Sequence, residues 1–202
     1  TSDLLQQALS DDVETSFNQI TIDGDTSTND MVLVMANGLA GNATITTASE
    51  DYDHFKSMLH TVTTALAIDI ASDGEGATKL LSVTVNNGHS ELDARMVAKK
   101  VVGSSLVKTA MFGKDPNWGR IIAAIGASDV TINPNIIDIA LNDIPVMTAG
   151  APVEFNQEMM SQSLEQKNIA IAINLHNGAA HGQAWGSDLT YEYVKINALY
   201  TT

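Results

Sequence analysis

The stretch Asp73-Gly74-Glu75-Gly76-Ala77-Thr78-Lys79 separates two segments whose apolar residues repeat with different periods. Residues 51–71 have the spacing of a helix, and residues 80–85 alternate as in a strand. Glycine allows positive φ and a close approach of a ligand or another segment. The order helix, glycine-flanked acid, strand therefore predicts an α/β protein with Glu75 at the edge of an element, where binding groups are common. The alternative is an ordinary helix stop followed by a solvated charge.

Two segments upstream of this stretch are expected to contribute to the core. Met31 to Ala36 is a continuous apolar run of strand length, which is typical of a strand buried on both faces. The helix over residues 51–71 has an apolar stripe that we expect to face inward. The stripe consists of Phe55, Met58, Leu59, Val62, Ala65 and Leu66. Asp69 continues it, and the pattern leaves open whether this carboxylate is partly buried with a partner or turned to solvent.

Further periodic segments extend the α/β pattern along the chain. We expect a capped helix from Ser2, a short strand around Ile20 and Ile22, a helix over residues 92–107, a hairpin with its turn at Asn142-Asp143, a helix over residues 156–167 and a strand over residues 169–175. Residues 188–200 fit either a short helix or a strand. The pattern of apolar residues changes beyond Ala127, where short alternating segments begin, so we expect two parts, residues 1–127 and residues 128–202.

Composition argues against several classes of function. The 202-residue chain has a net charge of −14, and its ten Lys and Arg residues include no cluster larger than Lys99-Lys100. Nucleic acid and anionic membrane are therefore not expected as partners. No apolar run approaches the roughly 18 residues of a membrane span. The absence of cysteine excludes disulfides and thiolate chemistry and suits a reducing compartment, so we expect a cytoplasmic protein.

Motif spacing identifies candidate loops but no reaction. The polar turn Asp23 to Asp30 resembles a calcium loop, but an EF-hand needs Gly at position six and Glu at position twelve, and these places hold Thr28 and Val34. Ala110 to Arg120 combines a cation, an acid, a proline and a tryptophan, a mixture that recurs beside active sites. The sequence contains neither a Walker-type phosphate loop nor an H-E-x-x-H motif, and we expect no metal site.

Four motifs occur together and in order along the chain. They are Asp23-Gly-Asp-Thr-Ser-Thr-Asn-Asp30, Asp73-Gly-Glu-Gly-Ala-Thr-Lys79, Phe112-Gly-Lys-Asp-Pro-Asn-Trp-Gly-Arg120 and Asp188-Leu-Thr-Tyr-Glu-Tyr-Val-Lys-Ile-Asn197. With these motifs the chain resembles the β chain of the ornithine acetyltransferases, the glutamate N-acetyltransferases of arginine biosynthesis. The resemblance runs nearly end to end.

The resemblance implies a layered α-β-β-α sandwich related to self-processing amidohydrolases. Members of the family are made as one precursor that cuts itself before a threonine, and the resulting α and β chains assemble, commonly as α2β2. The new terminal threonine is the nucleophile, and its own amine can serve as base. The acetyl group passes from N-acetylornithine to this threonine and then to glutamate. No cofactor is implied, although some members also accept acetyl-CoA as acetyl donor.

Three positions of this chain match substrate contacts of the family, namely Glu75, Asn197 and Thr202. The oxyanion-hole residues of the family lie on the α chain. The tail departs from the family at Leu199, where an acid is common, and at Thr201, where a basic residue is common. This departure bears on the geometry of the tail and on the choice of acetyl donor.

We expect the nucleophile just upstream of Thr1 rather than at Thr1. In the family it opens an apolar strand, since a buried strand end holds its hydroxyl and amine rigidly. Thr1 is instead followed by Ser2-Asp3 and by the apolar spacing of a helix. The chain should therefore be preceded by one more strand that begins with the catalytic threonine. The alternative is that Thr1 is itself the processed end.

Two other functions remain open on the sequence. A self-processing aminopeptidase of the same fold would share the sandwich, but it would not combine the Glu75 loop with the C-terminal contacts. A binding domain would use residues 74–79 as a ligand loop without catalysis.

Overall fold

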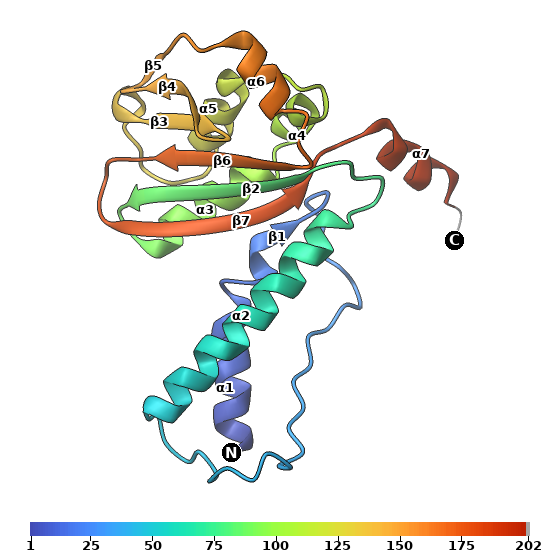
Figure 1. Ribbon diagram of the computed structural model, residues 1–202, viewed down its shortest axis with the longest axis vertical. Helices are drawn as coiled ribbons and strands as arrows, with labels where there is room; N and C mark the ends of the chain where they lie inside the picture. Colours follow the sequence, from blue (N-terminus) through green and yellow to red (C-terminus); the bar gives the residue numbers. More distant parts are fainter. Residues whose placement is uncertain (201–202) are drawn as a thin grey trace.

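Seven strands form one mixed sheet in the computed structural model, which describes residues 1–200 (Figure 1). The strands lie in the order β1-β7-β2-β6-β3-β4-β5. They are β1 (Ile20–Thr21), β2 (Leu80–Gly88), β3 (Asp138–Leu141), β4 (Ile144–Thr148), β5 (Ala151–Pro152), β6 (Asn168–Asn174) and β7 (Ala180–Ser187). The helices are α1 (Ser2–Val13), α2 (Glu50–Ser72), α3 (Glu91–Val102), α4 (Ser105–Phe112), α5 (Trp118–Gly126), α6 (Gln157–Ser163) and α7 (Tyr191–Leu199), with short 3-10 turns at Phe17–Gln19 and Pro134–Ile136.

The core lies between one face of the sheet and the helices that cover it. Strand β2 runs parallel to β6 and antiparallel to β7. The parallel register places the alternating apolar residues of β2 beside the isoleucines of β6, and helices α3 and α5 pack on the same side. The buried cluster includes Leu81, Val83, Val85, Val97, Val101, Ile121, Ile125, Ile169, Ile171 and Ile173. Burial of each such side chain contributes about 1.5–3 kcal/mol, so this layer stabilises the elements that hold the loops.

Periodicity does not indicate strand β7, because the strand contains no β-branched residue. Its glycines are required by packing. A Cβ on Gly182 would lie 2.5 Å from the backbone N of Arg95 in α3, and a Cβ on Gly186 would lie 2.6 Å from the carbonyl O of Thr21 in β1. Glycine therefore allows α3 and β1 to approach β7 closely.

The expectation of one helix over residues 92–107 is wrong. The chain forms α3, which ends at Val102, and α4, which begins at Ser105. Ser104 separates them, because its hydroxyl accepts a hydrogen bond from the backbone N–H of Val107 and so caps α4. The break reorients the chain and brings Lys108 of α4 to Ser187 at the end of β7.

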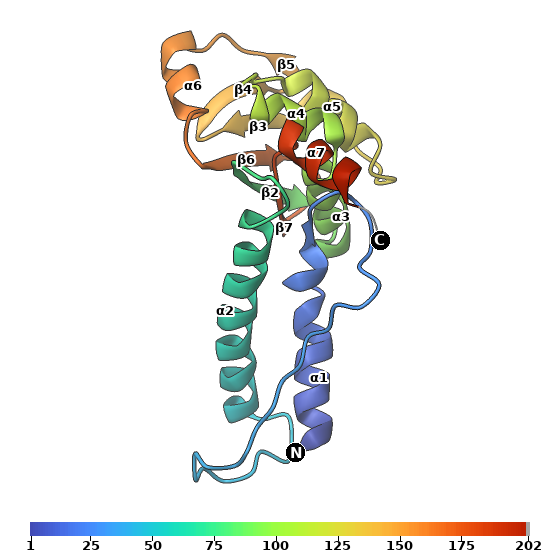
Figure 2. The same cartoon turned by 90° about the vertical axis from the view of Figure 1, so that its right-hand side faces the viewer.

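Helices α1 and α2 lie side by side and extend away from the sheet (Figure 1 and Figure 2). Two polar contacts join them: the Tyr52 hydroxyl donates to the carbonyl of Leu4 at 3.1 Å, and Asp12 lies 2.8 Å from Nδ1 of His60. The buried side of the second half of α2 consists of small residues, namely Thr63, Ala67 and Ala71. This pair therefore buries less apolar surface than the helices on the sheet.

Two expectations for this part of the chain are wrong. Met31 to Ala36 forms no strand, and Met31 and Met35 are 82% and 84% exposed, because no described strand lies beside the segment to pair with it. The apolar stripe of α2 faces outward, and Met58, Val62 and Leu66 are 53%, 57% and 50% exposed. Asp69 is also exposed, which favours the solvent-facing alternative.

Most other predicted elements are confirmed. These are the helix from Ser2, the helix over residues 51–71, the strand over residues 80–85, the hairpin at Asn142-Asp143 and the strand over residues 169–175. The side-chain cap expected for the helix from Ser2 is absent, because Thr1 stands at the N-cap and makes no capping hydrogen bond. The helix expected over residues 156–167 is shorter, and residues 188–200 contain helix α7. The division after residue 127 stays a prediction, and β2 is hydrogen-bonded to β6 and β7 across it. Among the described residues, no helix is both long and apolar enough to span a membrane.

Candidate functional site

The loop between α2 and β2, Asp73 to Lys79, packs backbone to backbone on helix α7. Gly76 has a φ of +65°, and a Cβ on it would lie 2.6 Å from the backbone N of Tyr193. The hydroxyl of Thr190, which caps α7, donates to the carbonyl of Gly76 at 2.7 Å. Only glycine combines this backbone conformation with so close an approach, so Gly76 fixes the position of α7 on the loop.

The other glycine of the loop packs against the sheet. A Cβ on Gly74 would lie 3.0 Å from Cδ1 of Ile22 and 3.0 Å from Oγ of Ser187. The N–H of Ala77 donates to the carbonyl of Gly74 at 2.9 Å and closes a turn around Glu75. The loop therefore lies against the ends of β1 and β7, with Glu75 presented between its two glycines.

Four side chains from three of the motifs meet at this loop. Oε2 of Glu75 accepts a hydrogen bond from Nδ2 of Asn197 at 2.7 Å. The hydroxyl of Tyr193, one turn earlier in α7, donates to Oδ2 of Asp23 at 3.0 Å. The structure thus brings two of the expected site residues, Glu75 and Asn197, into contact. Their role as substrate contacts stays a prediction.

The charge around Tyr193 is negative. Burial, and then the hydrogen bond to Asp23, raise the pKa of the Tyr193 phenol, with Glu75 and Asp25 acting in the same direction. A phenol with a raised pKa stays protonated at neutral pH and so remains a hydrogen-bond donor. A group of carboxylates at one loop can attract a cationic ligand.

Lys79, the last residue of the loop, is buried and bound to backbone carbonyls. Its Nζ donates to the carbonyl of Met111 at 2.6 Å and to that of Leu164 at 2.7 Å. Burial lowers the pKa of Lys79, against the opposing effect of Asp188. These contacts tie the start of β2 to α4 and α6, which gives Lys79 a structural role.

A second lysine, Lys108, lies beneath the loop and is 2% exposed. Its Nζ donates to the carbonyl of Ser187 and to Oγ of Ser187, the latter at 3.3 Å. Burial lowers the pKa of Lys108 to about 8, while Asp188 and Asp23 raise it. The lysine thus binds the residue on which Gly74 packs.

The second loop expected from the sequence, Ala110 to Arg120, contacts α7 through an aromatic pair. The rings of Phe112 and Tyr191 have centroids 5.7 Å apart and planes at 85°. Lys114 of this loop pairs with Glu165 at 3.0 Å. This loop therefore supports α7 by packing, and none of its described contacts reaches Glu75 directly.

The remaining expected positions lie apart from this cluster. Thr202 is outside the described residues. Thr1 precedes α1, and its amine donates to the carbonyl of Ile45 at 2.9 Å. In both views the N-terminus lies at the end of the α1–α2 pair remote from α7 (Figure 1 and Figure 2).

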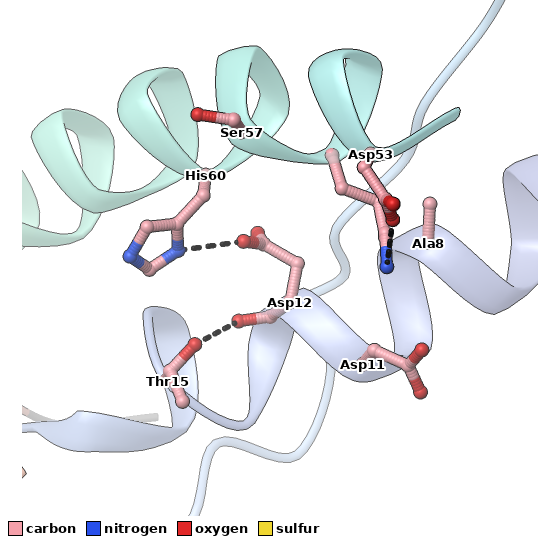
Figure 3. Close-up of a pocket in the computed structure, with 8 residues that line it drawn as sticks. Ala8, Asp11, Asp12, Thr15, Asp53, Ser57 and His60 are labelled. Carbon is pink, nitrogen blue, oxygen red and sulfur yellow. Dashed lines mark hydrogen bonds and ion pairs between the residues drawn. The ribbon is translucent and has the colours of Figure 1, made fainter. Parts of the chain in front are cut away.

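A separate hollow of about 360 Å³ lies between α1 and α2 (Figure 3). Most of its lining residues are polar or charged, and they include the Asp12–His60 pair, 2.8 Å apart, and the Asp53–Lys56 pair, 3.0 Å apart. All of its lining residues come from α1, α2 and the turn after α1, so it shares none with the Glu75 cluster. Within residues 1–200, no group of three or more His, Cys, Asp or Glu side chains could hold a metal ion.

Sequence reasoning missed Asp23, Tyr193, Lys108 and Asp188 as members of the site. Three of them lie inside the quoted motifs, and Lys108 lies four residues before one. Motif membership was therefore the available signal. Periodicity could not assign them, because their contacts join segments more than 75 residues apart, such as Asp23 and Tyr193, which are separated by 170 positions.

The fold and the loop cluster define a mixed α/β protein whose candidate site is assembled at one end of the sheet. The model of the ArgJ family matches residues 1–202. The chain therefore belongs to the ArgJ family.

Individual relatives agree with this assignment. The chain is 58% identical to the arginine biosynthesis bifunctional protein ArgJ of Streptococcus mutans and 57% identical to that of Staphylococcus epidermidis, covering 100% of this chain and 51% of each relative. It thus spans about half the length of these relatives. A crystal structure of the arginine biosynthesis bifunctional protein ArgJ from Bacillus halodurans has a TM-score of 0.96 and 49% identity, covering 99% of this chain and 94% of that chain. This match confirms the predicted layered α/β fold class. The described residues of this chain form one sheet and the helices that pack on it.

Proposed function

We propose that this chain is the β chain of an acetyltransferase that moves the acetyl group from N-acetylornithine to glutamate through an acetyl-threonine intermediate. The observation that carries the proposal is the match of the ArgJ family over the whole chain, together with relatives named for arginine biosynthesis. The protein itself carries the acetyl group, so no bound cofactor is needed. Acetyl-CoA is included in the proposal as a second acetyl donor, and the cytoplasm as the location.

Glu75 is proposed to bind the ammonium group of the ornithine side chain. Its carboxylate is exposed between two glycines and holds only an amide N–H of Asn197 at 2.7 Å in the described structure. A carboxylate accepts several hydrogen bonds, and a pair with an ammonium group is stronger than one with a neutral amide. Asn197 keeps its side-chain carbonyl free of a described donor and is proposed, with Thr202, to bind the polar backbone of the amino acid.

The proposed partner is the α chain from the same precursor, in an α2β2 assembly. The half-length coverage of the relatives supports a second chain of similar size. Exposed apolar side chains support it as well. They lie along α2 and in the unpaired segment before it, namely Met31, Leu33, Met35, Leu39, Met58, Val62, Leu66 and Ile70. Exposed apolar surface beyond scattered single side chains marks interaction sites, so we take these residues as the candidate surface.

Acetyl transfer measured on the co-expressed complex tests the proposal. Without glutamate the wild-type complex should release about one ornithine per site from N-acetylornithine as the threonine is acetylated, and it should turn over continuously, forming N-acetylglutamate, only with added glutamate. A repeat with acetyl-CoA tests the second donor. Glu75→Gln should raise the KM for N-acetylornithine about tenfold or more, because the charge-assisted contact is lost. Glu154→Gln, at an exposed acid without a described partner, is the matched control.

Other outcomes favour the rival functions. Hydrolysis of peptides without acetyl transfer would favour a self-processing aminopeptidase. An intact but inert complex would favour a binding module. Equal kinetics of Glu75→Gln and Glu154→Gln with N-acetylornithine would refute the role of Glu75 while leaving the activity itself in place.

A further inference from the structure

Polar contacts and close backbone packing hold helix α7 in place, since none of its residues is buried in the described structure. The contact nearest its start is the hydrogen bond from Thr190 to the carbonyl of Gly76, at 2.7 Å. Along the helix, Tyr193 binds Asp23 at 3.0 Å and Asn197 binds Glu75 at 2.7 Å. Because no side chain of α7 is buried, contacts such as these, together with the ring contact between Phe112 and Tyr191, orient the helix.

Tyr193 and Asn197 are four residues apart and therefore lie on the same face of α7. The two side chains are also linked to each other, because Nδ2 of Asn197 donates to the carbonyl of Tyr193 at 3.0 Å. This one face contacts two loops that are remote in sequence. A change in the angle of α7 at Tyr193 would therefore move the Asn197 amide relative to Glu75.

Asp23 is well placed to serve as the fixed end of this contact. It follows β1, which pairs with β7, and Oδ1 of Asp23 accepts a hydrogen bond from the N–H of Asp25 at 2.9 Å. The intervening Ile22 packs against the position of Gly74 in the Glu75 loop. The Asp23 turn and the Glu75 loop thus share one support, the sheet end, and α7 bridges them.

We propose that Asp23 and Tyr193 are positioning residues of the acetyl-transfer site: their hydrogen bond sets the angle of α7 and thereby holds Asn197 against Glu75. This inference rests on the function proposed above. It gives the polar turn Asp23 to Asp30 a role other than cation binding. Neither residue needs to touch the substrate for this effect.

Tyr193→Phe in the complete complex tests the inference, because it removes the hydroxyl and keeps the ring. The KM for N-acetylornithine should rise about tenfold, with a smaller change in kcat, because a hydrogen bond to a charged acceptor is lost from the binding geometry. Tyr191→Phe is the matched control on the same helix, since Tyr191 is 84% exposed and its hydroxyl has no described partner. Its kinetics should equal those of the wild type.

The acceptor side gives an independent readout. Asp23→Asn keeps only one of the two acceptor oxygens and loses the charge, so its KM should lie between that of the wild type and that of Asp23→Ala, and Asp23→Ala should match Tyr193→Phe. The double variant Asp23→Ala/Tyr193→Phe should be no worse than either single variant, because both remove the same contact. Additive losses in the double variant would overturn the pairing.

Hydrogen exchange separates this inference from the proposed function. Amides of α7 should exchange faster in Tyr193→Phe than in Tyr191→Phe. Equal exchange and equal KM in the two variants would overturn the inference even if the wild type transfers acetyl groups. A wild-type complex without acetyl transfer would overturn the proposed function and the catalytic relevance of the pair, and the exchange data would still decide whether the pair anchors α7.

Discussion

The carboxylate of Asp188 binds Thr78 twice, through the backbone N–H at 2.8 Å and through the side-chain hydroxyl. It also accepts the N–H of Lys79 at 3.0 Å. Asp188 directly follows β7, Thr78 and Lys79 are the last two residues before β2, and these strands are antiparallel. The buried carboxylate therefore closes the end of the central strand pair and fixes both the root of the Glu75 loop and the start of α7.

Asp188→Asn should lower the free energy of unfolding by about 2–3 kcal/mol, because hydrogen bonds to a buried charged acceptor are lost and an amide N–H meets backbone donors. Denaturant unfolding followed by circular dichroism measures this change. Asp129→Asn is the control, since Asp129 is exposed and its positive φ is tolerated by Asn. If Asp188→Asn lowers the free energy of unfolding no more than Asp129→Asn does, the Asp188 carboxylate does not hold the two strand ends together.

The buried ammonium of Lys108 gives a pH dependence of stability whose sign follows from its lowered pKa. The pKa of Lys108 is about 8 in the folded chain and 10.5 for an ordinary exposed lysine, so between these values the unfolded chain binds more protons than the folded chain. The free energy of unfolding should therefore rise with pH in this window. The charged groups that face Lys108 are Asp188 and Asp23.

Comparison of variants isolates this effect. Between pH 7 and pH 9, wild type should gain roughly 1 kcal/mol of stability relative to Lys108→Met, which removes the titrating group. Lys100→Met, at an exposed lysine, should follow the wild-type profile. Parallel profiles for wild type and Lys108→Met over this range would show that burial does not lower the pKa of Lys108.

The sequence predicts the sheet core well because alternation of large apolar residues, as in Ile169 to Ile173, depends on local spacing alone. It does not predict β7, where the strand signal is replaced by glycines that fit against Arg95 and Thr21. The outward stripe of α2, with Val62 at its centre, was misassigned because periodicity identifies an apolar face without identifying what covers it. Within the site, family motifs indicated Glu75 and Asn197, but the contact between them depends on tertiary structure.

Gly76→Ala should separate α7 from the Glu75 loop. A Cβ at this position would lie 2.6 Å from the backbone N of Tyr193, and an L-residue at a φ of +65° is strained by about 1–2 kcal/mol. We expect reduced stability and a loss of acetyl transfer larger than that of Tyr193→Phe. Gly126→Ala is the control, because nothing lies within 4 Å of a Cβ there and alanine favours the helix. Equal activity of the two variants would mean that α7 accommodates the methyl group.

Val62→Glu should weaken association with the proposed α chain while leaving this chain folded. Val62 is 57% exposed in the middle of α2, and glutamate has a higher helix propensity than valine. Within this chain the change should therefore alter stability by less than about 0.5 kcal/mol. If the stripe is covered in the complex, the charge would be buried without a partner, which costs several kcal/mol.

Met159→Glu is the control, at a methionine that is 58% exposed on α6, remote from α2 (Figure 1). Co-purification of the two chains, followed by size-exclusion chromatography, should recover the complex with Met159→Glu and much less of it with Val62→Glu. Equal recovery would place the partner elsewhere and leave the stripe of α2 as solvent-exposed surface.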